Sequence, residues 1–190
     1  MTAPHDELEV KARVDDPAAL ERAIGAAGAA LEFRGAMTDR RFDREGALAA
    51  RDEVVRLREY APGDGAGYGV LGWKGPSTTR GDYRHRAELE LRVEDASAAL
   101  ELLRRLGFAE TLRIDRRVAV YRLGGATLRL EWYPEMDVLI EVEGDPAAIE
   151  RAVAATGLDR GRFLAASLPS FVDAYERRTG RRARLAGTVA

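Results

Sequence analysis

Three short segments of the chain carry two glutamates separated by one residue. The pairs are Glu7 and Glu9, Glu88 and Glu90, and Glu141 and Glu143. In a β-strand, residues two apart point to the same side of the sheet, so each pair places two carboxylates on one face. The intervening residues are apolar and would point into a layer on the other face: Leu8, Leu89 and Val142. The pattern predicts strands with one charged face and one buried face.

Each glutamate pair is followed by a helical pattern. Asp16 and Asp145 stand immediately before Pro17 and Pro146, which is the favoured order of an N-cap and a first helical residue. Apolar residues recur at helical spacing after each aspartate cap. Glycines stand where these helices should end, at positions 28, 107 and 157, because glycine readily takes the left-handed conformation of a C-terminal cap. We expect a further helix from Leu168 or Pro169 to Arg178.

Other segments alternate with the period of a strand. They are residues 54–58, 69–74, 112–122 and 126–132, and loops rich in glycine and proline separate some of them. No long linker divides the chain. We therefore predict one α+β domain of about eight mostly antiparallel strands, with helices outside the sheet. We expect the domain to cover residues 1–180, followed by a frayed basic and small-residue tail over residues 181–190.

Composition excludes several classes of function. The net charge of the 190-residue chain is −2, so bulk charge does not indicate a nucleic-acid or membrane partner. There is no cysteine, which excludes disulfides, thiolate metal sites and a cysteine nucleophile. No signal peptide is visible at the N-terminus, and no apolar run approaches the ~20 residues of a membrane span. We expect a soluble cytoplasmic protein.

The repeated glutamate pairs admit two interpretations. One is the solvent-facing side of an antiparallel sheet with surface salt bridges, which any single pair would fit. However, carboxylates about 7 Å apart repel by about 2 kcal/mol at an effective dielectric near 20. Repeating that cost on three strands makes sense if a cation lies among them. Oxygen ligands favour magnesium, calcium or manganese, and arginines or lysines on the same face would hold phosphates. The second interpretation is therefore a metal–polyphosphate site.

Glu7-x-Glu9-x-Lys11 is similar to the N-terminal ExExK signature of the CYTH superfamily, the triphosphate tunnel metalloenzymes. Three further segments resemble the family's D-x-Y-F-D, T-D-E-A-L-R-x-R and Y-K-G-P elements, namely residues 38–43, 51–58 and 73–76. Three later segments resemble its R-x-E-x-E, L-G-F…K-x-R-x-x-Y and S-Y elements, namely residues 86–90, 106–121 and 170–171. Glu131 and the pair at 141 and 143 stand at the spacing of the family's Asp and closing E-x-E. The resemblance implies an eight-stranded antiparallel closed barrel that binds a triphosphate.

The resemblance also implies the site residues. The candidate ligands for Mg²⁺ or Mn²⁺ are Glu7, Glu9, Glu131, Glu141 and Glu143, with Glu88 and Glu90 supporting. The candidate phosphate-binding residues are Lys11, Arg56, Arg58, Lys74, Arg86 and Arg116. The candidate catalytic residues are Lys11, Glu9 and Glu141. Lys11 would exchange protons with the attacking water if burial lowers its pKa.

Four departures from the family pattern concern this site. The tyrosine before Phe42 is Arg41, and the second basic residue of K-x-R is Val118, for which Arg113 or Arg117 would have to compensate. The family's Asp is Glu131, and residues 135–139 replace a glycine-containing lead into the last glutamate pair.

The leading functional hypothesis is a metal-dependent hydrolase of inorganic or small organic triphosphates, such as tripolyphosphate, thiamine triphosphate or a nucleoside triphosphate. A class IV-like adenylyl cyclase that converts ATP to cyclic AMP and pyrophosphate is the first alternative. A non-catalytic binder of polyphosphate or nucleotide is the second, favoured by Arg41 and Val118. We expect no nucleic-acid or membrane partner.

Overall fold

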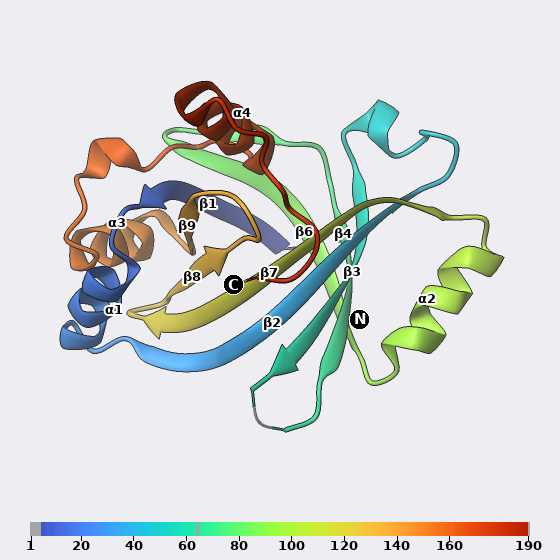
Figure 1. Ribbon diagram of the computed structural model, residues 1–190, viewed down its shortest axis with the longest axis horizontal. Helices are drawn as coiled ribbons and strands as arrows, with labels where there is room; N and C mark the ends of the chain where they lie inside the picture. Colours follow the sequence, from blue (N-terminus) through green and yellow to red (C-terminus); the bar gives the residue numbers. More distant parts are fainter. Residues whose placement is uncertain (1–4, 64, 190) are drawn as a thin grey trace.

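The computed structural model describes residues 5–63 and 65–189 of the chain. Nine strands occur in these residues: β1 (His5–Val14), β2 (Ala30–Asp43), β3 (Val54–Pro62), β4 (Tyr68–Lys74), β5 (Thr78–Arg80), β6 (Tyr83–Val93), β7 (Ala109–Leu123), β8 (Ala126–Trp132) and β9 (Val138–Glu143). They form one antiparallel sheet in the order β1-β9-β8-β7-β2-β3-β4-β6-β5. Pairing of β1 with β6 closes eight of them into a barrel (Figure 1), and β5 pairs with β6 at its edge. The closed eight-stranded antiparallel barrel is confirmed.

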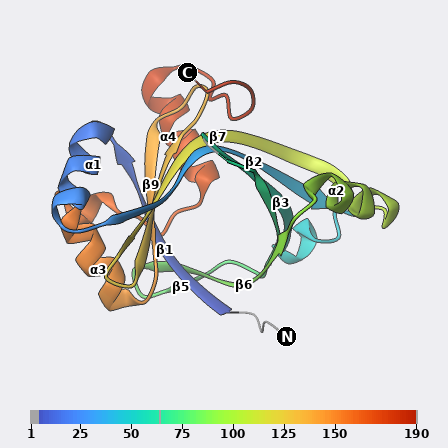
Figure 2. The same cartoon turned by 90° about the horizontal axis from the view of Figure 1, so that it is seen from below.

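In the described part of the chain four α-helices lie outside the barrel: α1 (Pro17–Ala26), α2 (Ala96–Arg105), α3 (Pro146–Ala155) and α4 (Leu168–Thr179). The first three begin as predicted, because Asp16, Asp95 and Asp145 each accept a hydrogen bond from a backbone N–H three residues later at 2.9 Å. Figure 2 shows α1 and α3 together on one side of the barrel and α2 on the opposite side. None of the helices in the described ranges is both long enough and apolar enough to cross a membrane.

The main hydrophobic core lies between the barrel and these helices, and a smaller apolar cluster lies inside the barrel. Val10 of β1 and Ile140 of β9 are fully buried with Ile24 of α1 and Ile149 of α3. On the opposite side, Leu103 of α2 joins a buried cluster with strands β2 and β3. Because strand side chains alternate, the residues between these apolar positions point into the barrel. The charged face of each glutamate-bearing strand is therefore its inner face.

The long strand β2 was absent from the predicted strands. Its 14 residues pair with β3 on one edge and β7 on the other. Charged or polar side chains occupy both of its faces near the C-terminal end, so the sequence lacks the apolar–polar alternation that marks a strand. Gly35 also interrupts the strand pattern in the sequence. Close packing explains why glycine stands there, because a Cβ at this position would lie 2.2 Å from the carbonyl oxygen of Ala61.

The predicted fraying of residues 181–190 is wrong for the part that the structure describes, which ends at residue 189. The backbone of Arg184 exchanges hydrogen bonds of 2.9 and 3.0 Å with Glu135, and the N–H of Asp115 donates to the carbonyl of Leu185 at 2.8 Å. Leu185 also packs against the cluster that contains Ile114. This apolar anchor, which a basic and small-residue composition conceals, holds the segment against β7. Residue 190 lies outside the described residues.

Candidate functional site

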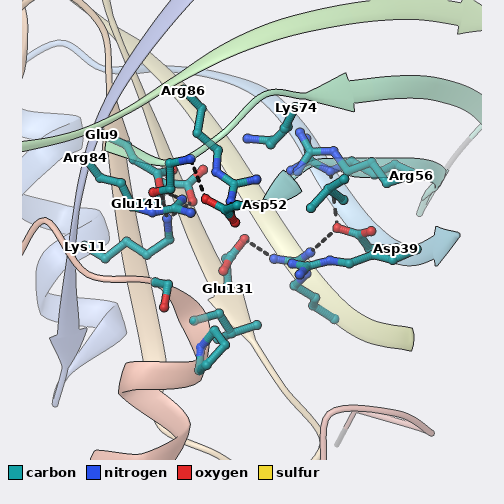
Figure 3. A pocket seen from close by; sticks show the side chains of 18 of the residues that line it. Glu9, Lys11, Asp39, Asp52, Arg56, Lys74, Arg84, Arg86, Glu131 and Glu141 are labelled. Carbon is teal, nitrogen blue, oxygen red and sulfur yellow. Dashed lines mark hydrogen bonds and ion pairs between the residues drawn. The ribbon is translucent and has the colours of Figure 1, made fainter. Parts of the chain in front are cut away.

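A cavity of about 360 Å³, here called the main cavity, lies inside the barrel. All eight barrel strands contribute to its wall, as does the start of α4. Among residues 5–63 and 65–189, eight basic side chains line it: Lys11, Arg41, Arg56, Arg58, Lys74, Arg84, Arg86 and Arg116. Five carboxylates also line it: Glu9, Asp39, Asp52, Glu131 and Glu141 (Figure 3). The excess of basic groups suits an anionic ligand with many oxygen atoms.

A second cavity of about 330 Å³ shares Arg58 with the main cavity. Carboxylates outnumber basic groups in its wall, which includes Glu7, Glu88, Glu90 and Glu143 together with Arg122 and Arg129. A cavity with a mainly basic wall and a cavity with a mainly acidic wall thus meet inside one barrel.

Three carboxylates converge where the two cavities meet. Oxygen atoms of Glu7, Glu9 and Glu141 all lie within 4.8 Å of one another. Burial raises the pKa of Glu7, but the charges of Lys74 and Arg56 outweigh it and lower that pKa to about 2. Burial likewise opposes ionisation of Glu141, but Lys11 and Arg129 hold its pKa well below the usual range. Both side chains are therefore available as carboxylate ligands at neutral pH.

Lys11 lies within this carboxylate cluster. Its Nζ atom is 2.7 Å from Oε1 of Glu9 and 2.6 Å from Oε2 of Glu141. Burial lowers the pKa of Lys11, but the charges of Glu141 and Glu9 outweigh burial and raise it above the usual value. Lys11 is consequently a cation here, which favours phosphate binding over proton exchange with water.

Asp39 organises two of the predicted phosphate-binding arginines. Its Oδ2 atom lies 2.9 Å from Nη2 of Arg116 and 3.6 Å from Nε of Arg58. Burial raises the pKa of Asp39, but the guanidinium groups of Arg58, Arg56 and Arg116 hold it well below the usual range. The guanidinium group of Arg116 donates to Asp39 at 2.9 Å and to Glu131 at 2.6 Å, and Figure 3 labels both of these carboxylates. Arg116 is therefore held in one orientation from both sides.

Glu131 and Glu143 lie outside the three-carboxylate cluster. Glu131 accepts hydrogen bonds from Arg116 at 2.6 Å and from the hydroxyl of Tyr133. Glu143 lines the second cavity and lies 3.9 Å from Arg129. The structure thus places these two predicted ligands against arginines.

The supporting carboxylates, Glu88 and Glu90, contact basic residues of the site. Arg56 donates to Glu88 at 3.3 Å and to Glu90 at 3.0 Å. Lys74 contacts Glu88 and lies 3.0 Å from Glu7. The remaining predicted phosphate-binding residue, Arg86, lies in the main cavity and donates to Asp52 at 2.6 Å.

The candidate site residues inferred from the sequence left out several residues of the barrel interior. Arg84 donates to Glu9 at 2.7 Å, and Arg129 donates to Glu141 at 2.5 Å. The alternation of strand side chains predicts that both residues point into the barrel, because Arg84 is two residues from Arg86 and Arg129 is two residues from Glu131. The same alternation relates Asp39 to Arg41, but the strand that holds both was not predicted.

Val118 lies in an apolar cluster inside the barrel. It is fully buried with Met37 and Tyr60, and Phe33, Tyr68 and Val70 pack against them. The rings of Tyr60 and Tyr68 stack with centroids 4.8 Å apart. Arg113 and Arg117 are exposed, and the guanidinium of Arg117 lies 4.7 Å from the ring centroid of Trp132. Neither arginine compensates for the missing basic residue.

A CYTH domain profile matches residues 5–162 of the chain. A comparison with curated proteins gives no match.

Several solved structures share the fold. A putative adenylate cyclase from Vibrio parahaemolyticus has a TM-score of 0.75 at 18% identity, covering 90% of this chain and 99% of that one. The PH1012 protein from Pyrococcus horikoshii has a TM-score of 0.68 at 22% identity, covering 87% and 98%. HpAC1 from Hippeastrum, described as a putative adenylyl cyclase with dominant triphosphatase activity, has a TM-score of 0.64 at 20% identity, covering 93% and 97%. At these identities the likeness shows a common fold.

Proposed function

The chain belongs to the CYTH family, and from this premise we propose that it is a metal-dependent phosphohydrolase acting on inorganic or small organic triphosphates inside the barrel. One observation carries the proposal. Five arginines that line the main cavity each keep a buried Nε–H without an acceptor among the described residues: Arg41, Arg56, Arg58, Arg86 and Arg116. Buried donors without partners are costly, and the oxygens of a polyphosphate would supply the missing acceptors.

The candidate metal ligands are Glu7, Glu9 and Glu141. The donor set fits Mg²⁺ or Mn²⁺ because it consists of carboxylate oxygens that lie within 4.8 Å of one another. A bound ion of this kind supplies charge neutralisation at phosphate oxygens and a water of lowered pKa. Glu131 and Glu143 remain candidates for a wider set of ligands, with Glu88 and Glu90 supporting, although arginines or Lys74 contact them.

The chain's own residues would bind and orient the substrate. Arg56, Arg58 and Arg116 present planar guanidinium groups to the same cavity, an arrangement suited to bidentate phosphate contacts. The carboxylates beside Arg116 fix its direction and reduce the reorganisation required on binding. Lys11 would add a compact positive charge beside Glu9 and Glu141, at the place where metal and phosphate would meet.

A panel of substrates tests this function. Tripolyphosphate, thiamine triphosphate and ATP are incubated with the protein and Mg²⁺, Mn²⁺ or a chelator, and phosphate release and organic products are measured. We expect metal-dependent phosphate release from at least one triphosphate, and none from the Glu9→Gln variant purified in parallel. Binding of tripolyphosphate in a thermal-shift assay without turnover of any substrate would favour the non-catalytic binder.

An adenylyl cyclase is the second candidate, favoured by the structural neighbour described as a putative adenylate cyclase. The same basic cavity would hold ATP, with the ribose 3′-hydroxyl in place of water as the nucleophile. The panel separates the two activities, because cyclic AMP with pyrophosphate indicates the cyclase. ADP or AMP with phosphate, and no cyclic AMP, would exclude it.

A further inference from the structure

Arg41 differs from the other basic residues of the main cavity. Each of the other seven has a nitrogen atom within 4.0 Å of a carboxylate oxygen. Within the described residues Arg41 makes no such pair, and its buried Nε–H has no acceptor. Arg41 as a whole is partly buried, and a guanidinium that is partly removed from water without a counter-ion is unfavourable. This position is therefore suited to an anion that comes from outside the chain.

The pairing of β2 with β3 places a second positive charge beside Arg41. In the strand register Arg41 lies directly opposite Arg56, whereas the next inward-facing pair joins Asp39 to Arg58. Like charges directly opposite each other destabilise a sheet, and opposite charges stabilise it. The pair of Asp39 with Arg58 is thus balanced by itself. In the neighbouring pair Arg56 has Glu88 and Glu90 as carboxylate partners, whereas Arg41 has none among the described residues. An anion beside Arg41 would balance its charge.

Arg41 lies toward the end of the barrel where a ligand would enter. It precedes the last residue of β2, Asp43, by two positions. Exposed Asp52 and the first residues of α4 line the same cavity. At the inner end, ion pairs such as those of Arg129 with Glu141 and of Lys74 with Glu7 lie between the main cavity and the acidic second cavity. An organic group on a triphosphate held by the basic wall would therefore lie on the side of Arg41.

The cavity wall offers such an organic group little surface for stacking. Among the described lining residues the one aromatic side chain is that of Tyr133, which is 5% exposed and donates its hydroxyl to Glu131. The same wall presents the charge of Arg41. Charge without a stacking partner favours a phosphoryl group over a heterocyclic ring at this place.

We propose that Arg41 binds the outermost phosphoryl group of the substrate and makes the cavity selective for a polyphosphate with an unesterified group at that end. The preferred substrate class is then inorganic tripolyphosphate, with nucleoside triphosphates bound more weakly. The inference rests on the proposed function, because it requires a triphosphate in the main cavity.

Calorimetric titration of the full chain in chelator tests the inference, with tripolyphosphate and ATP as the two ligands. In Arg41→Met the tripolyphosphate Kd should rise about tenfold or more, as expected for loss of a charge-assisted hydrogen bond, and the ATP Kd by less than about threefold. Arg41→Lys should recover part of the tripolyphosphate affinity. Arg113→Met, which removes an exposed arginine of β7, should match the wild type.

Each alternative outcome has a distinct meaning. Unchanged tripolyphosphate affinity in Arg41→Met, or an equal loss for both ligands, would overturn the role of Arg41 while leaving the proposed function standing. A wild-type protein that binds neither ligand, with or without Mg²⁺, would overturn the proposed function and this inference together. Far-UV circular dichroism of each variant verifies the fold before titration.

Discussion

Lys11 and Glu141 are direct cross-strand partners on β1 and β9, with Nζ of the lysine 2.6 Å from Oε2 of the glutamate. Because the same Nζ atom also contacts Glu9, one lysine balances two of the three carboxylates of the candidate metal site. A divalent ion bound by these carboxylates would share them with Lys11. The strength of metal binding therefore depends on the charge of all three residues.

Replacing Glu141 tests this dependence. Glu141→Gln removes one carboxylate charge and weakens the pairing of Lys11, so we expect metal-dependent phosphate release to fall by roughly 10²-fold or more. Glu9→Gln should behave in the same way. The matched control is Glu110→Gln, which alters a carboxylate on the outside of the barrel that pairs with Arg40. Full activity in both Glu141→Gln and Glu9→Gln would refute the metal-site assignment.

Asp39 should contribute strongly to stability when no phosphate is bound. Asp39→Asn removes the carboxylate between the buried guanidinium groups of Arg58 and Arg116. We expect the free energy of unfolding to fall by roughly 3–5 kcal/mol, the usual cost of breaking a buried ion pair from one side. Urea denaturation in chelator measures it. Glu59→Gln, which affects a partly exposed pair with Arg40 on the outside of the barrel, should cost less than about 1 kcal/mol. Equal costs in the two variants would contradict the expectation.

The pKa of Glu7 predicts how stability depends on pH. Burial opposes ionisation, but Lys74 and Arg56 lower the pKa from 4.5 to about 2 in the folded protein. Near pH 3 the unfolded chain therefore binds a proton at Glu7 that the folded chain does not. The contribution of Glu7 is fully present above about pH 4.5 and is lost as the pH falls toward 2. Urea denaturation between pH 6 and 3 in chelator should show a shallower loss of stability in Glu7→Gln than in the wild type. Parallel dependence of stability on pH in the two proteins would exclude the lowered pKa of Glu7.

Local sequence patterns predicted most elements of this fold. The aspartate caps at positions 16 and 145 locate the starts of α1 and α3, because their side chains satisfy backbone N–H groups within the same turn. Period-two alternation located the strands that have one apolar face. Strand β2 escaped because both of its faces are polar near Asp39, and closure of the barrel followed from family resemblance and not from periodicity.

The site was less accessible to sequence reasoning because its geometry depends on pairing between distant strands. Parity placed Glu7 and Glu9 on one face, but their convergence with Glu141 depends on the register of β1 against β9. A shift of one residue would have turned the opposing side chains to the other face. Glu143 shows the limit of inference from side-chain alternation, because it shares a strand face with Glu141 and yet lines the second cavity.

Val118 should not tolerate the basic residue that the family pattern has at its position. The side chain is fully buried between Met37 and Tyr60, so Val118→Arg would place a guanidinium in an apolar cluster. We expect a loss of roughly 3 kcal/mol or more in the free energy of unfolding, because a buried charge without a partner is strongly unfavourable. Thr111→Arg, on an exposed position of the same strand, should change stability by less than about 0.5 kcal/mol. Urea denaturation compares the two variants. Wild-type stability in Val118→Arg would show that this end of the barrel accepts a charged side chain. The apolar cluster would then not explain why valine stands at position 118.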